Sequence, residues 1–491
     1  MISQKSLIFS LSLSFYIFIF IMSNSQDESL ISAIKTLHDR YSFILEKCQQ
    51  WNKQSPILGL YRYTNSLNAE KHFIEKLLQE PTLIKKEHVQ STNLGYLEPV
   101  YEALESIECK NEVMKIIGVP LPNQDIWLSQ VALIKRKSIK VDIIAQNGLV
   151  WVKVIARNAK AFRHEVMGLE QKEDDDYCSD DDDDDDIKEP SASDFDSLPI
   201  FNKARDYLTA ARACHVHYHT PIVVFAFMRI RPQEDVFVQR IMDRLTEMGI
   251  VVHLQTPDND LQRTYMPLLK GIDVTNLSTE KLNLDVSSIF ALISELSHHP
   301  CSPDDISAIP IKVQAEREAS VRCLPQLKRI VEGKELYMVQ TAYDRLKSII
   351  DIVGGPNEIA RFQYLFRHSL GHSETPFDQD LWSILPPLEV HVIQDAPSTE
   401  FFQLLEPPPQ KSKLNNGRKI RTRFSEFHAI VFGSGHYYKM TTLTAIQWME
   451  KALADAGVLG TFIIYGQKIK TRRFVSITFI LATVLCTKVS E

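Results

Sequence analysis

The chain has 491 residues, 44% of them hydrophobic and 24% charged, and its mean hydropathy of −0.14 is typical of a globular protein. This composition excludes a collagen, a coiled-coil rod, a disulfide-stapled miniprotein and a polytopic membrane protein, and the length predicts roughly two to four domains. The net charge is −7, but eleven acidic residues lie within Glu173–Asp186, so the rest of the chain is mildly basic at +4.

The chain opens with an apolar run, Leu7–Ile21. The run is shorter than the roughly 20 residues that a membrane-spanning helix needs, but it has the length of a signal-peptide core, and Ser23 and Ser25 offer a cleavage pattern. The seven cysteines are scattered and odd in number, which suits a reducing compartment. We therefore expect a cytoplasmic or nuclear protein in which residues 1–21 are an inert or non-native extension; a secretory or membrane-tethered protein is the alternative.

Residues 22–125 are predicted to form a helical module. Apolar residues recur at intervals of three and four from Leu30 to Cys48, and Leu97–Ile117 repeats the pattern until Gly118 ends it. No catalytic motif occurs in this part, so the helices are expected to pack against another surface, such as a protein partner.

Residues 130–262 are predicted to form a central α/β domain. Its first feature is a β-hairpin over Lys140–Arg157 with Asn147-Gly148 at a type I′ turn. An acidic insert, 171–197, cannot bury apolar surface and is expected to be a disordered loop that is open to protein partners. Helix, strand, helix and strand then follow at 201–214, 221–228, 235–248 and 250–254.

The order of these elements also resembles the restriction-endonuclease-like topology. That core needs an Asp on one strand and an acid-x-Lys on the next. Asp142 and Lys153 suit these positions, but Trp151 stands where the second acid is required. An ordinary cross-strand charge pair is therefore the simpler interpretation.

Three histidines alternate before the strand at 221–228, namely His215, His217 and His219. On a strand they would share one face, but zinc usually needs four ligands and no second cluster is visible. We therefore expect a hydrogen-bonded edge strand here.

Residues 278–470 alternate between strands and helices, which predicts a three-layer α/β domain with a mainly parallel sheet. The whole chain is thus assigned to the α/β class, or α+β overall. The last residues, 471–491, form an apolar tail that is expected to be a terminal strand, with a membrane anchor as the alternative. The predicted strands are 281–286, 335–339, 388–393, 427–432 and 460–465, and the predicted helices are 287–296, 341–353, one opening at 356, and 440–456 after a tight Gly433-Ser434-Gly435 turn.

Sites in parallel sheets form at the carboxyl ends of the strands, so polar residues at these ends are site candidates. Asp285, Gln340 and His436 occupy such positions in the predicted pattern. Each also has a structural interpretation. Asp285 could cap the following helix, and Gln340 and His436 could be hydrogen-bonded structural residues.

Four segments of the chain stand out together: Asn283–Ser288, Gly333–Tyr337, Gly354–Pro356 and Val431–Gly435. They resemble an uncharacterised eukaryotic protein family. Its C-terminal domain of unknown function is similar to PIN-domain nucleases, and the match covers roughly 278–470, with a further likeness at Val141–Arg157. The resemblance implies several carboxylates at strand ends that hold one or two divalent metals, Mg²⁺ or Mn²⁺, which activate water against a phosphodiester.

By position, the resemblance makes Asp285 the first metal-binding acid, with Gln340 and His436 in the second and third places. Asp344, one helical turn after Gln340, could substitute for a missing carboxylate. Since Gln and His bind hard cations poorly, we expect a weakened or inactive nuclease site in a domain that associates with RNA. The alternatives are an active Mg²⁺- or Mn²⁺-dependent ribonuclease and a non-enzymatic protein–protein scaffold.

A basic segment, 411–423, precedes one of the predicted strands and contains no acid. Such a segment at the rim of a site could hold phosphates with salt-dependent, sequence-independent affinity. A nuclear-localisation signal and a solvated loop are the alternatives. Its six cationic residues are Lys411, Lys413, Arg418, Lys419, Arg421 and Arg423.

Overall fold

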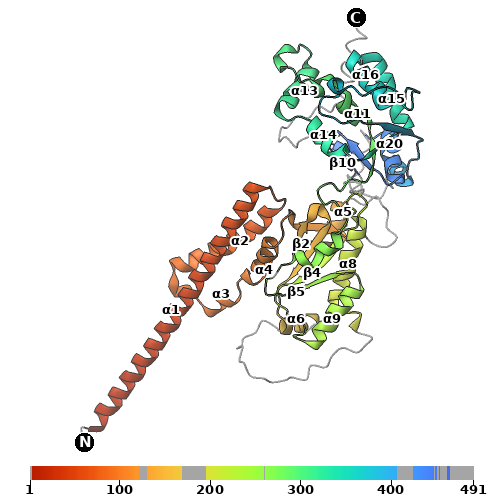
Figure 1. Cartoon of the computed structure of the whole chain (residues 1–491). Helices are drawn as coiled ribbons and strands as arrows, with labels where there is room; N and C mark the ends of the chain where they lie inside the picture. Colours follow the sequence, from red (N-terminus) through yellow and green to blue (C-terminus); the bar gives the residue numbers. More distant parts are fainter. Residues whose placement is uncertain are drawn as a thin grey trace. The chain divides into compact units, whose positions relative to one another are not determined.

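The computed structural model (Figure 1) describes residues 3–120, 130–167, 195–258, 260–405, 424–446, 448, 449, 453 and 462–464. The chain divides into two compact units. The first contains Met1–Ile116, Ile139–Leu208 and Ile222–Gly271, and the second contains Ile117–Ser138, Thr209–Pro221 and Ile272–Glu491. The acidic run 173–186, the basic segment 411–423 and the tail 471–491 all lie outside the described residues.

The first unit begins with helices, as the apolar periodicity predicts. Ile34, Tyr41 and Cys48 of the first helix are buried, and so are Tyr63 and Leu67 of the second. Among the described residues, no helix combines the length and the apolar character that crossing a bilayer requires. The helices are α1 (Ser3–Gln54), α2 (Leu60–Gln79), α3 (Lys86–Gln90) and α4 (Leu94–Glu105), with a 3₁₀ turn at Pro81–Leu83.

The helical prediction is wrong for the end of Leu97–Ile117, because Lys110–Gly118 forms strand β1. Within this strand Met114 has a φ of 54°, which breaks the regular alternation of side chains. The buried residues Val113, Met114 and Ile117 therefore fall at spacings that imitate one face of a helix.

A sheet of order β1-β2-β3-β4-β5 forms the rest of the first unit. Strand β2 is antiparallel to β3, and β3, β4 and β5 are parallel neighbours. This confirms the predicted hairpin and the α/β units after it. The strands are β2 (Ser138–Ala145), β3 (Val150–Ile155), β4 (Ile222–Phe227) and β5 (Val251–Leu254), and the helices are α6 (Ala159–Val166), α8 (Pro199–Ala213), α9 (Val236–Glu247) and α10 (Gln262–Tyr265), the last followed by a 3₁₀ turn at Met266–Leu269.

The hairpin turn differs from the expected two-residue type. Ala145 pairs with Val150, so four residues form the loop, and Gln146 and Asn147 have φ values of 51° and 55°. The side chain of Asn111 explains this geometry, because its Oδ1 accepts from the Asn147 N–H at 2.7 Å and its Nδ2 donates to the Asn147 side chain at 3.0 Å. A partner outside the hairpin thus sets the turn.

The histidine-rich segment is a tight turn, and the expected edge strand is wrong. Val216 and His219 exchange backbone hydrogen bonds, and the two residues between them have left-handed φ values of 46° and 69°. His217 and Tyr218 therefore lie at the tip of the turn. Within the second unit, Nδ1 of His217 lies 3.2 Å from Thr441 Oγ1, and the Tyr218 hydroxyl donates to the Met440 carbonyl at 3.3 Å.

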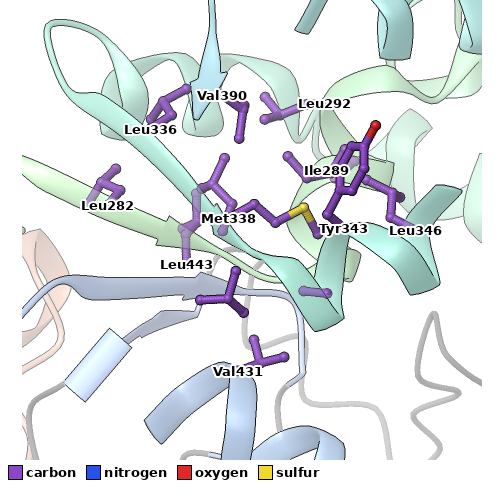
Figure 2. Close-up of a cluster of buried hydrophobic side chains, with 14 of the residues drawn as sticks. Leu282, Ile289, Leu292, Leu336, Met338, Tyr343, Leu346, Val390, Val431 and Leu443 are labelled. Atoms are coloured by element: carbon purple, nitrogen blue, oxygen red, sulfur yellow. The ribbon is translucent and has the colours of Figure 1, made fainter. Parts of the chain in front are cut away.

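The second unit is built on a parallel sheet of order β10-β9-β6-β7-β8. Side chains from β6 to β9 converge with those of α11, α15 and α20 in one apolar core, and Figure 2 labels several of them, including Met338 and Leu443. The strands are β6 (Lys281–Leu284), β7 (Glu335–Val339), β8 (Val390–Ile393), β9 (Thr441–Thr444) and β10 (Phe462–Ile464). The helices are α5 (Gln130–Arg136), α11 (Val286–Ile293), α12 (Glu295–His298), α13 (Ile309–Ser320), α14 (Leu324–Val331), α15 (Gln340–Val353), α16 (Pro356–Leu365), α17 (Gln379–Trp382), α18 (Thr399–Gln403) and α20 (Glu426–Tyr437).

The prediction fails between 426 and 444, where helix and strand are exchanged. The expected strand 427–432 and the Gly433-Ser434-Gly435 turn lie inside helix α20, and the expected helix from 440 opens as strand β9. The glycines serve close packing instead of a turn. A Cβ at Gly435 would lie 2.2 Å from Thr442 Oγ1 and 2.9 Å from Asn283 Nδ2. Helix α20 therefore rests directly on β6 and β9.

Replacing Gly435 with alanine is expected to lower the free energy of unfolding by about 2 kcal/mol, because the added methyl group forces α20 away from the sheet. Denaturant titration of the full chain measures the change. Gly95→Ala in α4 is the matched control, since a Cβ there meets nothing within 4 Å and alanine is the better helix former. Equal midpoints for the two variants would contradict the close contact.

A buried histidine makes the stability of the second unit depend on pH. His298 is 3% exposed, donates from Nε2 to the Leu292 carbonyl at 2.7 Å and meets Trp382 edge-on. Burial lowers the pKa of His298 to about 4, against 6.5 in a solvated imidazole.

Between pH 6.5 and 4 the unfolded chain therefore takes up a proton at His298 that the folded chain excludes, so stability falls as the pH is lowered through this window. The loss is at most about 1.4 kcal/mol per pH unit for one group. His298→Phe keeps a ring beside Trp382 and should show a shallower fall than the wild type in denaturant titrations at pH 7, 6 and 5. Parallel curves would show that His298 is not the titrating group.

Candidate functional site

The strand order of the second unit reverses between β6 and β9. From β6 the chain continues to β7 and β8 on one side, whereas β9 continues to β10 on the other. In parallel sheets, ligands bind outside the carboxyl ends of the strands at such a point. Asp285 follows β6 and Thr444 ends β9, so the two side chains meet there.

The Asp285 carboxylate is 2% exposed and is surrounded by neutral donors. Oδ1 accepts from the Ser288 N–H and the Ser288 hydroxyl, both at 2.8 Å, and from the Ser287 hydroxyl at 2.7 Å. Oδ2 accepts from the Thr444 hydroxyl at 2.6 Å and from Ser287 at 2.9 Å. Burial raises the pKa of Asp285, and these hydrogen bonds oppose the shift by favouring the ionised form.

The same hydroxyls also form hydrogen bonds with backbone groups around the carboxylate. Ser287 Oγ accepts from the Ala445 N–H at 2.9 Å, Thr444 Oγ1 accepts from the Ile446 N–H at 3.0 Å, and the Ser288 hydroxyl also contacts the Leu443 carbonyl. Asp285 is at once the N-cap of α11 and the link between β6 and the end of β9. Both interpretations of Asp285, strand-end acid and helix cap, therefore describe the same geometry.

Gln340 and Asp344 form a second polar group, at the start of α15. Both are exposed, and Gln340 Nε2 donates to Asp344 Oδ1 at 2.9 Å. Beside them the backbone N–H and the hydroxyl of Thr341 donate to the two carboxylate oxygens of Asp395, at 3.1 and 2.6 Å. Asp395 lies just beyond β8 and was missed from the sequence, although an acid directly after a strand is the same signal that singled out Asp285.

His436 lies near the end of α20, which leads into the amino end of β9. It was expected at a carboxyl end only because 427–432 was wrongly predicted as a strand. The imidazole Nδ1 is 2.9 Å from Ser398 Oγ, and burial lowers its pKa. His436 therefore does not follow the carboxyl end of a strand, and Thr444 takes the position at the carboxyl end of β9.

Within the described residues, no group of three or more His, Cys, Asp and Glu side chains is arranged to hold a metal ion. The six cationic residues of 411–423 fall between α18 and α20, outside the described part of the chain.

The first unit brings Asp142 and Lys153 together across β2 and β3. Lys153 Nζ lies 2.9 Å from Asp142 Oδ2, which also accepts from the Val154 N–H at 2.8 Å, and the Tyr96 hydroxyl donates to Oδ1 at 2.6 Å. Trp151, at the position where a nuclease would carry its second acid, is buried. The arrangement is the cross-strand charge pair that was expected.

Comparison with known families gives two matches, both to families of unknown function. Residues 24–184 match the model of a family of unknown function (DUF5614), and residues 282–380 match that of a protein of unknown function (DUF1308). No solved structure matches the chain. The Asp285 side chain and the start of α15 both lie within the second match.

Removing the carboxylate with Asp285→Ala is expected to lower the free energy of unfolding by about 3 kcal/mol, because the Ser288 N–H and the hydroxyls of Ser287 and Thr444 lose their buried acceptor. Denaturant titration measures the loss. Asp344→Ala removes an exposed carboxylate from the same edge and should change stability by no more than roughly 0.5 kcal/mol. Similar changes in the free energy of unfolding for both variants would show that the hydrogen bonds to Asp285 do not stabilise the fold.

Proposed function

We propose that the second unit is a PIN-like domain that associates with RNA and carries a degenerate nuclease site. The observation behind this proposal is the Asp285 carboxylate, which stands where the strand order reverses but is occupied by hydroxyl and amide donors. A metal-dependent phosphodiesterase uses a carboxylate at this position to bind a cation. Here the same carboxylate accepts hydrogen bonds from protein donors instead.

The donor set explains why the site is proposed to be degenerate. Mg²⁺ binds through near-octahedral oxygen coordination and commonly takes one or two carboxylates together with waters and phosphate oxygens. Both oxygens of Asp285 already accept hydrogen bonds, and the Ser287 hydroxyl is shared between them, so a cation would have to displace donors from a buried position. Gln340 is neutral and is held by Asp344, and Asp395 is held by Thr341.

RNA is the proposed partner because of the basic segment 411–423. The segment carries six positive charges and no acid, and the helix that follows it, α20, begins at the carboxyl edge of the sheet. A run of cations without acids neutralises phosphates whatever the nucleotide sequence. The proposed compartment is the cytoplasm or nucleus, in keeping with described cysteines that form no disulfide bond: Cys48, Cys109, Cys301 and Cys323.

The test measures binding of a labelled single-stranded RNA to the full chain across a salt series. If all six cations contact phosphates, the logarithm of the affinity should fall with the logarithm of the salt concentration with a slope of about −4. Neutralising the six residues to glutamine should remove most of this binding. A control variant of equal charge neutralises six exposed cations elsewhere and should bind as the wild type does: Lys35, Lys53, Lys85, Lys160, Lys270 and Arg329.

Incubation with Mn²⁺ separates the competing functions. The proposal expects intact RNA with the wild type and with Asp285→Asn, which keeps the shape of the side chain. Cleavage that Asp285→Asn abolishes would instead identify an active metal-dependent ribonuclease. Absence of binding even at low salt would favour a protein–protein scaffold.

A further inference from the structure

Four ring side chains gather where α20 begins, and they are called the aromatic cluster here: Phe424, Phe427, His428 and Trp448. His428 is central, since its ring centroid lies 5.8 Å from those of Phe424 and Phe427 and 5.4 Å from that of Trp448. Phe424 is buried, whereas the other three rings are partly exposed.

The aromatic cluster lies at the carboxyl edge of the sheet. Helix α20 runs back toward the amino end of β9, so its first turn, with Phe427 and His428, lies near the carboxyl ends of the strands. Trp448 follows the end of β9 by four residues. The cluster thus belongs to the same edge as Asp285, although Asp285 itself is closed off by its hydroxyl partners.

A cation covers one of the rings. The guanidinium carbon of Arg345 lies 5.0 Å from the centroid of Phe427. Arg345 is exposed, and within the described part of the chain no carboxylate lies within ion-pair distance of it. Its neighbour Asp344 contacts Gln340 instead. An exposed guanidinium that rests on a ring without a counter-ion is suited to a ligand that is both planar and anionic.

We propose that Arg345, Phe427 and Trp448 form a stacking site for the bases of a single-stranded nucleic acid. Aromatic rings and guanidinium planes are the surfaces on which unpaired bases stack, and the positive charge attracts the adjoining phosphates. The inference rests on the proposed association with RNA and adds the position of the bases to it.

The charges on the cluster favour a nucleic acid over an apolar peptide. His428 adds no charge at neutral pH, because burial, with a smaller contribution from Arg345, lowers its pKa to about 4. It accepts instead from the backbone N–H of Ser425, which fixes the start of α20. Among the described residues, none of the strongly exposed apolar side chains belongs to the aromatic cluster. The surface therefore offers partly exposed rings beside an exposed guanidinium rather than an apolar groove.

The experiment compares two ligands of equal charge, a single-stranded oligouridylate and an abasic strand with the same number of phosphates. Trp448→Leu should weaken binding of the oligouridylate roughly 5- to 100-fold and leave binding of the abasic strand unchanged. Arg345→Ala, which alters an exposed side chain, should weaken oligouridylate binding as well, and it provides a second variant should Trp448→Leu not fold. Tyr437→Leu, whose ring is 61% exposed at the other end of α20, should bind both strands as the wild type does.

The outcomes distinguish the two proposals. If the wild type binds both strands and neither Trp448→Leu nor Arg345→Ala discriminates between them, the stacking site is wrong while the association with RNA stands. If the wild type binds neither strand at low salt, the association with RNA fails and the stacking site fails with it.

Discussion

The C-terminal unit depends on the solvation of one buried carboxylate by protein groups. An ionised side chain that is removed from water is costly unless hydrogen bonds replace its hydration. At Asp285 these come from Ser287 and Ser288 on the next turn of the chain and from Thr444 at the end of a neighbouring strand. The requirement thereby fixes the start of α11, the end of β9 and the register between β6 and β9 at a single point.

The two units each bury a carboxylate but satisfy it differently. Asp142 has a cation, Lys153, together with a tyrosine hydroxyl and a backbone N–H. Asp285 has only neutral partners. In both cases each carboxylate oxygen accepts a hydrogen bond, so both acids stabilise the fold. An acid that binds a catalytic metal would instead need oxygens that are open to the cation. A buried carboxylate without a cation beside it is the more unusual of the two arrangements.

Local sequence signals predicted much of the fold and the helix-capping role of Asp285, but not its contact with Thr444. Strand β7 and helix α15 follow from apolar runs with clear boundaries, and the serines after Asp285 predict a helix cap. The partner of Asp285 on β9 could not be predicted, because α20 is buried on many sides and its Gly-Ser-Gly sequence has the composition of a turn. Only the proximity of Asn283 and Thr442 to Gly435 shows why glycine is there. The prediction for β1 failed for a related reason. The positive φ of Met114 gives the buried residues of the strand the spacing of a helix.

The separation of Asp285 from Thr444 along the chain has a consequence for how the protein acquires its structure. The two residues are 159 positions apart, so their contact closes a long loop and contributes late to a folding reaction. During synthesis on a ribosome, β6, β7 and β8 emerge well before β9. Until β9 emerges, the Asp285 carboxylate has only Ser287 and Ser288 as partners. One side of the central strand β6 therefore stays unpaired until β9 has been synthesised. During this interval the nascent chain most needs protection from aggregation.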